Sequence, residues 1–184
     1  MFLFDKLFGR RDKTAVRAPL ANQEAPVSPT PAAIPHDHAA PGTHIRHHPE
    51  LIQKFKKDHQ VLLQLFMATK HAADAGDAVT AAERLQDFRS ALQDHLLSEN
   101  VRLYVYLEHA LVHDAISHGL VHEFRREMDE IGKVVVGFIG QYQQLAQHPD
   151  MVKRFAEDLD GIGKVLIKRI QREEETLYPL YQPV

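Results

Sequence analysis

The stretch Asp94-His95-Leu96-Leu97-Ser98-Glu99-Asn100-Val101-Arg102-Leu103-Tyr104 places an imidazole and a carboxylate four residues apart. Residues at this spacing lie one above the other on a helix, and the surrounding leucines predict that the same face is buried. A near-copy occurs close to the C-terminus and reads Arg169-Ile170-Gln171-Arg172-Glu173-Glu174-Glu175-Thr176-Leu177-Tyr178-Pro179. The chain therefore has two related helical segments, one with an intact histidine–glutamate pair and one in which arginine replaces the histidine.

Apolar residues recur at steps of three and four after Pro49, which is the spacing of amphipathic helices. Thr80 followed by Glu83 resembles a capping box and is expected to start the second helix. No alternating strand pattern competes, so we predict an all-α fold, an antiparallel up-down four-helix bundle with short connections. The expected helices span about residues 49–75, 80–110, 120–146 and 149–179.

The residues before the predicted bundle fall into two parts. Residues 1–13 form a short apolar segment that contains charges and is too short to cross a bilayer. Peripheral membrane or partner contact through residues 1–11 is one expectation, and simple packing on the domain is the alternative. Residues 14–48 are rich in proline, alanine and histidine without an apolar period, so we expect a flexible linker and assign the bundle to residues 49–184.

The overall composition excludes several classes of function. Apolar residues make up 44% of the 184, enough for a globular core, and the formal net charge of -3 offers no basic excess for nucleic acid. The chain has no cysteine, which excludes disulfides, iron–sulfur clusters and thiolate zinc sites. Any metal must therefore be bound by nitrogen and oxygen ligands. The absence of cysteine also permits a reducing compartment, and we expect a cytoplasmic location.

Four polar residues lie on the inward stripes of three predicted helices. They are His59 on the first helix, His95 and Glu99 on the second, and Glu173 on the fourth. A buried carboxylate costs several kcal/mol unless it is paired, hydrogen-bonded or bound to a cation. The pattern therefore predicts a positive group between Glu99 and Glu173.

The same residues resemble those of the hemerythrin-type, HHE cation-binding domains. The resemblance rests on Asp58-His59, on His95 with Glu99, and on Glu173 ahead of Leu177-Tyr178-Pro179, and it covers about residues 49–181. It implies a four-helix bundle with a non-haem metal centre. In that centre His59, His95, Glu99 and Glu173 would be the metal ligands.

Two positions depart from the pattern of the family. Where the resemblance requires histidines for a second iron, this chain has Met128 and Arg169. The guanidinium of Arg169 is expected to pair with Glu99 and Glu173 in place of that ion, with outward snorkelling as the alternative. His118 and His122 are expected too far from the site to replace the missing ligands.

Three functional interpretations remain open. The first is a sensor or regulatory module with one retained iron, manganese or zinc ion. The second is a metal-free bundle that acts through an unknown protein partner, and the third is a di-iron protein that binds O₂ or NO, which the missing histidines disfavour. No catalytic constellation is present in the sequence apart from the metal site, so we do not expect an enzyme. Glu174 and Glu175 are expected to be solvated acids.

Overall fold

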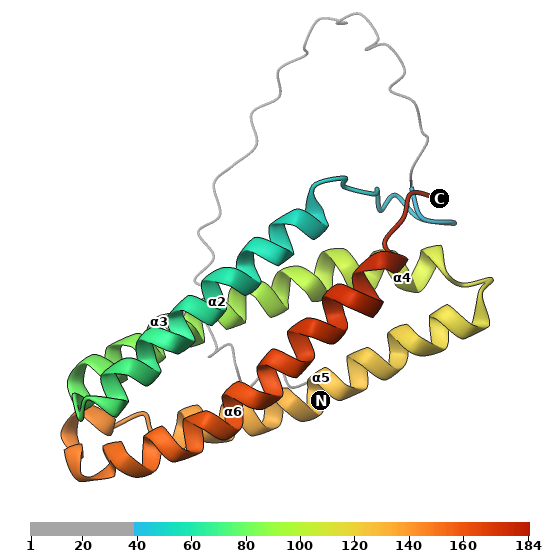
Figure 1. Cartoon of the computed structure of the whole chain (residues 1–184). Coiled ribbons are helices and arrows are strands. Elements are labelled where there is room, and N and C mark those ends of the chain that lie inside the picture. The colour runs from blue at the N-terminus through green and yellow to red at the C-terminus, as the bar shows by residue number, and fades with distance from the viewer. Residues whose placement is uncertain (1–38) are drawn as a thin grey trace, which may run out of the picture.

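The computed structural model describes residues 39–184, which form an up-down bundle of four long helices (Figure 1). The α2–α3 turn and the α5–α6 connection lie at one end, and the C-terminus lies at the other. The predicted antiparallel bundle is confirmed. The long helices are α2 (Leu51–Asp74), α3 (Ala78–Ser98), α5 (Ala115–Gln141) and α6 (Val152–Arg172).

Two helices begin earlier than the sequence pattern predicted, because aspartates cap them. Asp77 accepts a hydrogen bond from the Thr80 backbone N–H at 2.9 Å, so Asp77 rather than Thr80 is the N-cap of α3. Asp114 caps α5 through the backbone N–H groups of Ile116 and Ser117, both at 3.1 Å. The third helix therefore starts about five residues before the predicted position.

Both copies of the repeated segment end in a π-helical turn. After α3 the chain continues through the π-helix Glu99–Tyr104 into α4 (Val105–Ala110). After α6 it continues through the π-helix Glu173–Leu177 and a 3₁₀ turn, Tyr178–Leu180. A π turn holds an extra residue, and such turns occur frequently at functional sites. Each turn begins at a glutamate of the motif.

The α5–α6 connection consists of two short 3₁₀ turns, Leu145–Gln147 and Pro149–Met151. Leu145 is buried at this end of the bundle. α6 starts at Val152, within a few residues of its predicted start.

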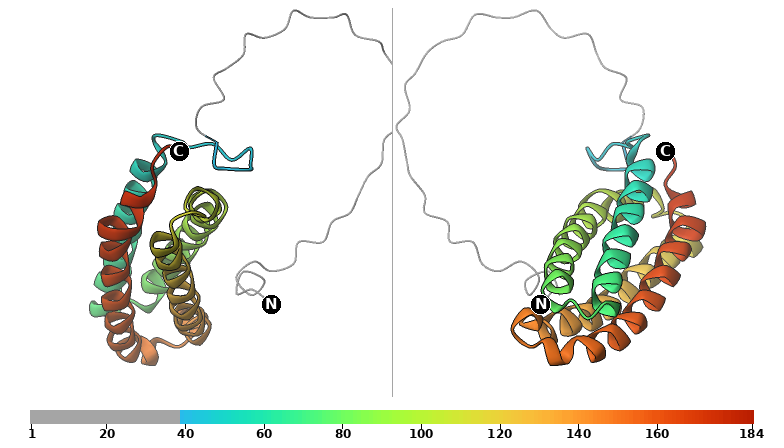
Figure 2. Two further views of the ribbon diagram at one scale, coloured as in Figure 1. Left: turned by 90° about the vertical axis from the view of Figure 1, so that its right-hand side faces the viewer. Right: turned by 60° about the vertical axis from the view of Figure 1, so that its left-hand side comes forward.

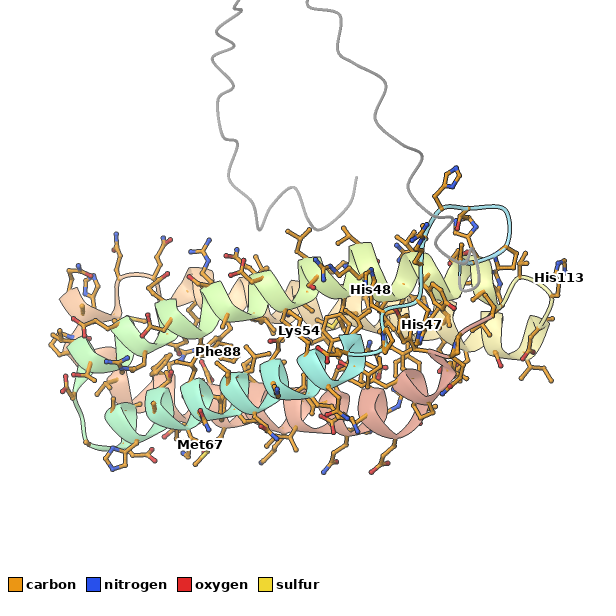
Figure 3. The ribbon with its side chains drawn as sticks, turned by 90° about the horizontal axis from the view of Figure 1, so that it is seen from above. His47, His48, Lys54, Met67, Phe88 and His113 are labelled. Carbon is orange, nitrogen blue, oxygen red and sulfur yellow. The ribbon has the colours of Figure 1, made fainter. Side chains whose placement is uncertain are left out.

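The apolar core consists of two clusters with a polar layer between them. The cluster nearer the α2–α3 turn includes Leu62 and Phe88, and the cluster nearer the C-terminus includes Phe55 and Leu103. Phe88 points into the bundle whereas Met67, on α2, lies on its outside (Figure 3). Because His59 falls between Phe55 and Leu62 along α2, the polar layer lies where the two clusters meet.

α6 approaches α2 closely at Gly163. A Cβ built on this glycine would lie 2.4 Å from Cζ of Phe66, which is closer than packed carbon atoms can come. The Phe66 ring thus occupies the space that a side chain at position 163 would need. Gly161, two residues earlier, is different, because a Cβ added there would have no neighbouring atom within 4 Å.

The end of the expected linker packs against the bundle, near the C-terminus (Figure 2). Ala40 is buried, and the ring of His47 stacks on that of Tyr181 with centroids 4.5 Å apart. The backbone N–H of His48 donates to the hydroxyl of Tyr181 at 2.9 Å. The proposed membrane-contact segment, residues 1–11, and the rest of the linker up to residue 38 lie outside the described residues. No helix within residues 39–184 is long and apolar enough to cross a membrane.

Candidate metal centre

The structure brings the four predicted ligand residues together in the polar layer. His59 from α2, His95 from α3 and Glu173 after α6 each offer a ligand atom, and these atoms lie within 4.8 Å of one another. Glu99 joins them, with Oε2 3.8 Å from Nε2 of His95. All four side chains are buried. The four residues come from three helical segments of the chain, in agreement with their predicted positions on the inward-facing stripes.

Each of the two histidines has a carboxylate on its outer side. Nδ1 of His59 lies 2.8 Å from Oε1 of Glu174, and Nδ1 of His95 lies 3.7 Å from Oδ2 of Asp58. The Nε2 atoms face the centre, where that of His59 is 3.2 Å from Oε2 of Glu173. The side chain of Glu174, expected to be a solvated acid, is 32% exposed, but its carboxylate also contacts a buried ring, which the sequence did not indicate. Within the described residues His95 Nδ1 has no hydrogen-bond partner.

Tyr178 closes the centre on the side of the C-terminus. Its hydroxyl donates to Oε1 of Glu99 at 2.9 Å and lies 3.2 Å from Nε2 of His59. Its ring also stacks on that of His59, with centroids 5.6 Å apart. In the described part of the chain Oε2 of Glu99 is left as a buried oxygen without a hydrogen bond.

Arg169 points into the bundle beside this centre, rather than snorkelling to its end. Its Nε donates to Oε1 of Glu173 at 2.5 Å, and the NH2 nitrogen donates to the hydroxyl of Tyr104 at 2.9 Å. The NH1 nitrogen donates to the backbone oxygen of Phe124 at 3.1 Å and to Oε2 of Glu127 at 2.9 Å. The expected pairing with Glu173 is present. Glu99 is not among these hydrogen-bond partners, so the expected pairing of Arg169 with Glu99 is not found.

Glu127 has a role that the sequence pattern did not indicate. Its carboxylate accepts hydrogen bonds from both Arg169 and Arg172, so it anchors the guanidinium of Arg169 from α5. The neighbouring Met128 is partly buried and packs against the apolar cluster near the α2–α3 turn. A cavity of about 30 Å³ is lined by Met128 together with His59, His95 and Arg169. Such a volume can hold a water molecule.

Burial and charge shift the pKa values of the centre in opposite directions. Burial and the neighbouring Glu173 raise the pKa of Glu99 well above its usual value. Burial opposes ionisation of Glu173 too, but contacts with His59 and Arg169 outweigh it and lower its pKa. Burial likewise lowers the pKa of His59, yet the hydrogen bonds to Glu173 and Glu174 prevail and raise it. The contact between Glu173 and His59 thus favours the charged form of each.

His95 behaves differently from His59. Burial, followed by the nearby charge of His59, lowers the pKa of His95 to about 4. Its ring is neutral at pH 7, which is the form in which an imidazole can ligate a metal.

Comparison with known proteins identifies the family to which this chain belongs. The family model for the hemerythrin HHE cation-binding domain matches residues 50–181, most of the chain. The chain belongs to this family. Neither the curated proteins nor the solved structures gave a match. Membership of a cation-binding family agrees with the buried cluster of histidine and glutamate ligands.

Proposed function

We propose that this hemerythrin-family domain holds one divalent transition-metal ion through His59, His95, Glu99 and Glu173. The observation that carries the proposal is the orientation of the two imidazoles. Each turns Nδ1 toward an outer carboxylate and Nε2 toward the centre. Histidines that bind a metal usually donate from the second ring nitrogen to a carboxylate or carbonyl, which fixes the ring and its tautomer. His59 is placed to do so with Glu174, whereas His95 faces Asp58 at 3.7 Å without a hydrogen bond.

The chemistry of the donor atoms fits a single ion. Two imidazole nitrogens and two carboxylates suit iron(II), manganese or zinc. Oε2 of Glu99 is a buried oxygen without a hydrogen bond among the described residues, so it is free to serve as a ligand. When bound, the ion supplies a Lewis-acidic and, for iron, a redox-active centre.

Arg169 is proposed to take the place of a second ion. Its guanidinium is fixed by four hydrogen-bond acceptors and already neutralises Glu173. A second divalent cation next to this permanent positive charge would be repelled, and Met128 offers only a weak thioether ligand there. The residues present therefore fit one metal ion and do not fit two.

A sensor or regulatory role is the interpretation that this half-site favours. Handling O₂ with two irons needs both ligand sets, and this chain lacks the histidines of the second. The apolar segment at residues 1–13, followed by the linker, supports a domain that is presented to a partner protein or to a membrane surface from the cytoplasmic side. Deletion of residues 1–13 tests this part separately, since association that survives the deletion would exclude the segment as the anchor.

The proposal is tested by the metal content of protein purified without a histidine tag and loaded anaerobically with iron(II). We expect about one ion per chain after excess metal is removed, and its loss in His95→Ala. His113→Ala, which removes an exposed histidine, is the matched control and should retain the ion. Two ions per chain that are both lost in His95→Ala would refute the half-site and favour a di-iron centre.

A result of no bound metal would favour a metal-free bundle that binds a protein partner. One observation supports this second candidate: the centre compensates much of its own charge. Arg169 pairs with Glu173, Tyr178 donates to Glu99, and His59 lies between Glu173 and Glu174. In the described part of the chain, Oε2 of Glu99 and Nδ1 of His95 are buried without a hydrogen bond, and these unsatisfied atoms argue against it.

A further inference from the structure

A second cluster of potential ligands lies on the surface, where α4 and the start of α5 meet. Glu108 belongs to α4, whereas His118 and His122 occupy successive turns of α5. Nε2 of His118 and Nε2 of His122 each lie 3.2 Å from the same oxygen, Oε1 of Glu108. The three ligand atoms all lie within 4.8 Å of one another. None of these residues belongs to the buried centre.

The distances between these atoms match those between ligands of one small cation. Zinc binds nitrogen and oxygen at about 2.0–2.2 Å in a tetrahedron, which places neighbouring ligand atoms about 3.3 Å apart. The two 3.2 Å distances to Oε1 of Glu108 are close to this tetrahedral edge. A histidine pair four residues apart on a helix also presents both rings on one face. The rings of His118 and His122 lie 4.6 Å apart between centroids.

The carboxylate of Glu108 is not fully satisfied by protein groups. In residues 39–184 its Oε2 is a buried atom without a hydrogen bond. The nearest cationic nitrogen recorded is NH1 of Arg125 at 3.8 Å, too long for a hydrogen bond. The guanidinium of Arg125 instead lies over the ring of Tyr104, 5.6 Å from its centroid. An ion bound by the two histidines would supply the missing positive charge.

The cluster is open to solvent on one side. The side chains of Glu108 and His118 are 31% and 28% exposed, and that of His122 is 53% exposed. An ion can thus reach the three ligands from solution, and water can occupy the fourth position. Two imidazoles and one carboxylate with a water are a donor set that zinc accepts readily.

We propose that Glu108, His118 and His122 form a surface site for a divalent zinc-like ion, independent of the buried centre. Bound metal would connect α4 to α5 across the turn at residues 111–114 and hold the two helices together at this end of the bundle. The same end carries Tyr104, whose hydroxyl accepts a hydrogen bond from Arg169. The surface ion would therefore stabilise the α4–α5 junction next to the network around Arg169.

The test is a zinc titration of the full, metal-stripped chain against a competing chromophoric chelator. His118→Ala, His122→Ala and Glu108→Gln, each added to a chain that already carries His95→Ala so that the buried centre does not compete, should each weaken zinc binding by about tenfold or more. His113→Ala removes an exposed histidine from the turn just before α5 and should leave this site unchanged (Figure 3). His95→Ala alters only the buried centre and should also leave it unchanged. Histidines elsewhere in the chain are common to all of these proteins, so they do not affect the comparison.

Cobalt(II) replacing zinc gives a second readout, because tetrahedral cobalt absorbs strongly in the visible range and octahedral cobalt does not. We expect the tetrahedral spectrum in the His95→Ala chain and its loss when any of the three ligand substitutions is added, with unchanged far-ultraviolet circular dichroism. The proposal is overturned if the His95→Ala chain binds no zinc, or if adding the ligand substitutions leaves its zinc affinity unchanged. Loss of zinc in His95→Ala alone would place the ion in the buried centre and also overturn it.

Discussion

Replacement of Arg169 by methionine removes the positive charge of the buried network but keeps a side chain of similar length. The wild-type guanidinium is 3% exposed and donates to Glu173, Glu127, Tyr104 and the backbone oxygen of Phe124. In the variant, Glu173 keeps its contact with His59 but loses its permanent countercharge, and the carbonyl of Phe124 loses a donor. The variant therefore removes the charge and the hydrogen bonds of Arg169 but leaves no large cavity.

The expected loss of stability is about 4 kcal/mol. Removing one partner of a buried ion pair costs about 3–5 kcal/mol, because the other charge stays buried without compensation. Glu173 is 2% exposed and cannot recover this energy from water. The half-exposed Glu127 can be solvated, so its lost contact adds less than about 1 kcal/mol. For a domain of this size the loss corresponds to a fall in Tm of about 8–16 °C.

The assay is equilibrium urea unfolding of the metal-stripped chain, followed by far-ultraviolet circular dichroism. Arg172→Met is the matched control, because Arg172 also pairs with Glu127 but is one third exposed, and it should lose less than about 1 kcal/mol. Adding Glu173→Gln to Arg169→Met should recover a large part of the stability, since it removes the uncompensated charge. A loss below about 1 kcal/mol in Arg169→Met would refute the view that this guanidinium compensates the buried acids.

Three further predictions concern packing, stoichiometry and pH. Gly163→Ala should lose about 1–3 kcal/mol in urea unfolding, because its methyl would overlap the Phe66 ring. Gly161→Ala, which has open space, should gain about 0.5–1 kcal/mol, and the opposite order would contradict the packing. The double variant Met128→His, Arg169→His should bind a second metal ion by elemental analysis, and unchanged stoichiometry would count against the half-site. Metal affinity should fall by about tenfold per pH unit below the pKa of His59, because the raised pKa keeps a competing proton on the ring. Competition titrations between pH 8 and pH 5 would measure this fall. An affinity that does not change over this range would exclude His59 as a ligand.

The fold could be predicted from the sequence because each long helix carries an apolar stripe along one face, which packing of the four helices against one another buries. The ends of the helices were harder to predict. Asp114 lies before a stretch with little apolar periodicity, so its role as the cap of α5 depends on hydrogen bonds to Ile116 and Ser117 that the pattern does not reveal. Likewise Asp77 and Thr80 are both good cap residues, and only the geometry shows which of them caps α3.

The inward-facing histidines and glutamates of the centre could be predicted for the same reason, since their spacing follows the helical period. Glu174 could not, because on an α-helix it would point about 100° away from Glu173. Here both neighbours contact the ring of His59, Glu173 at Nε2 and Glu174 at Nδ1. Both lie in the π turn that begins at Glu173, where the α-helical spacing no longer applies. The contacts of the Tyr178 hydroxyl with Glu99 and His59, in the same region, could not be predicted from the sequence pattern either.

The two π turns also explain how one copy of the motif can lose its histidine without losing its shape. In the intact copy, Nε2 of His95 lies 3.8 Å from Oε2 of Glu99, four residues ahead of it in the chain. In the altered copy, Nε of Arg169 donates to Glu173 across the same interval, and the π turn again begins at the glutamate. A guanidinium can therefore satisfy the acid from the same backbone position. Met128 lies on α5, which has no π turn, and a methionine there satisfies no acid. Under the proposed single-ion centre, the positive charge that a second ion would have supplied falls to Arg169, so we expect this residue, rather than Met128, to keep a second metal out.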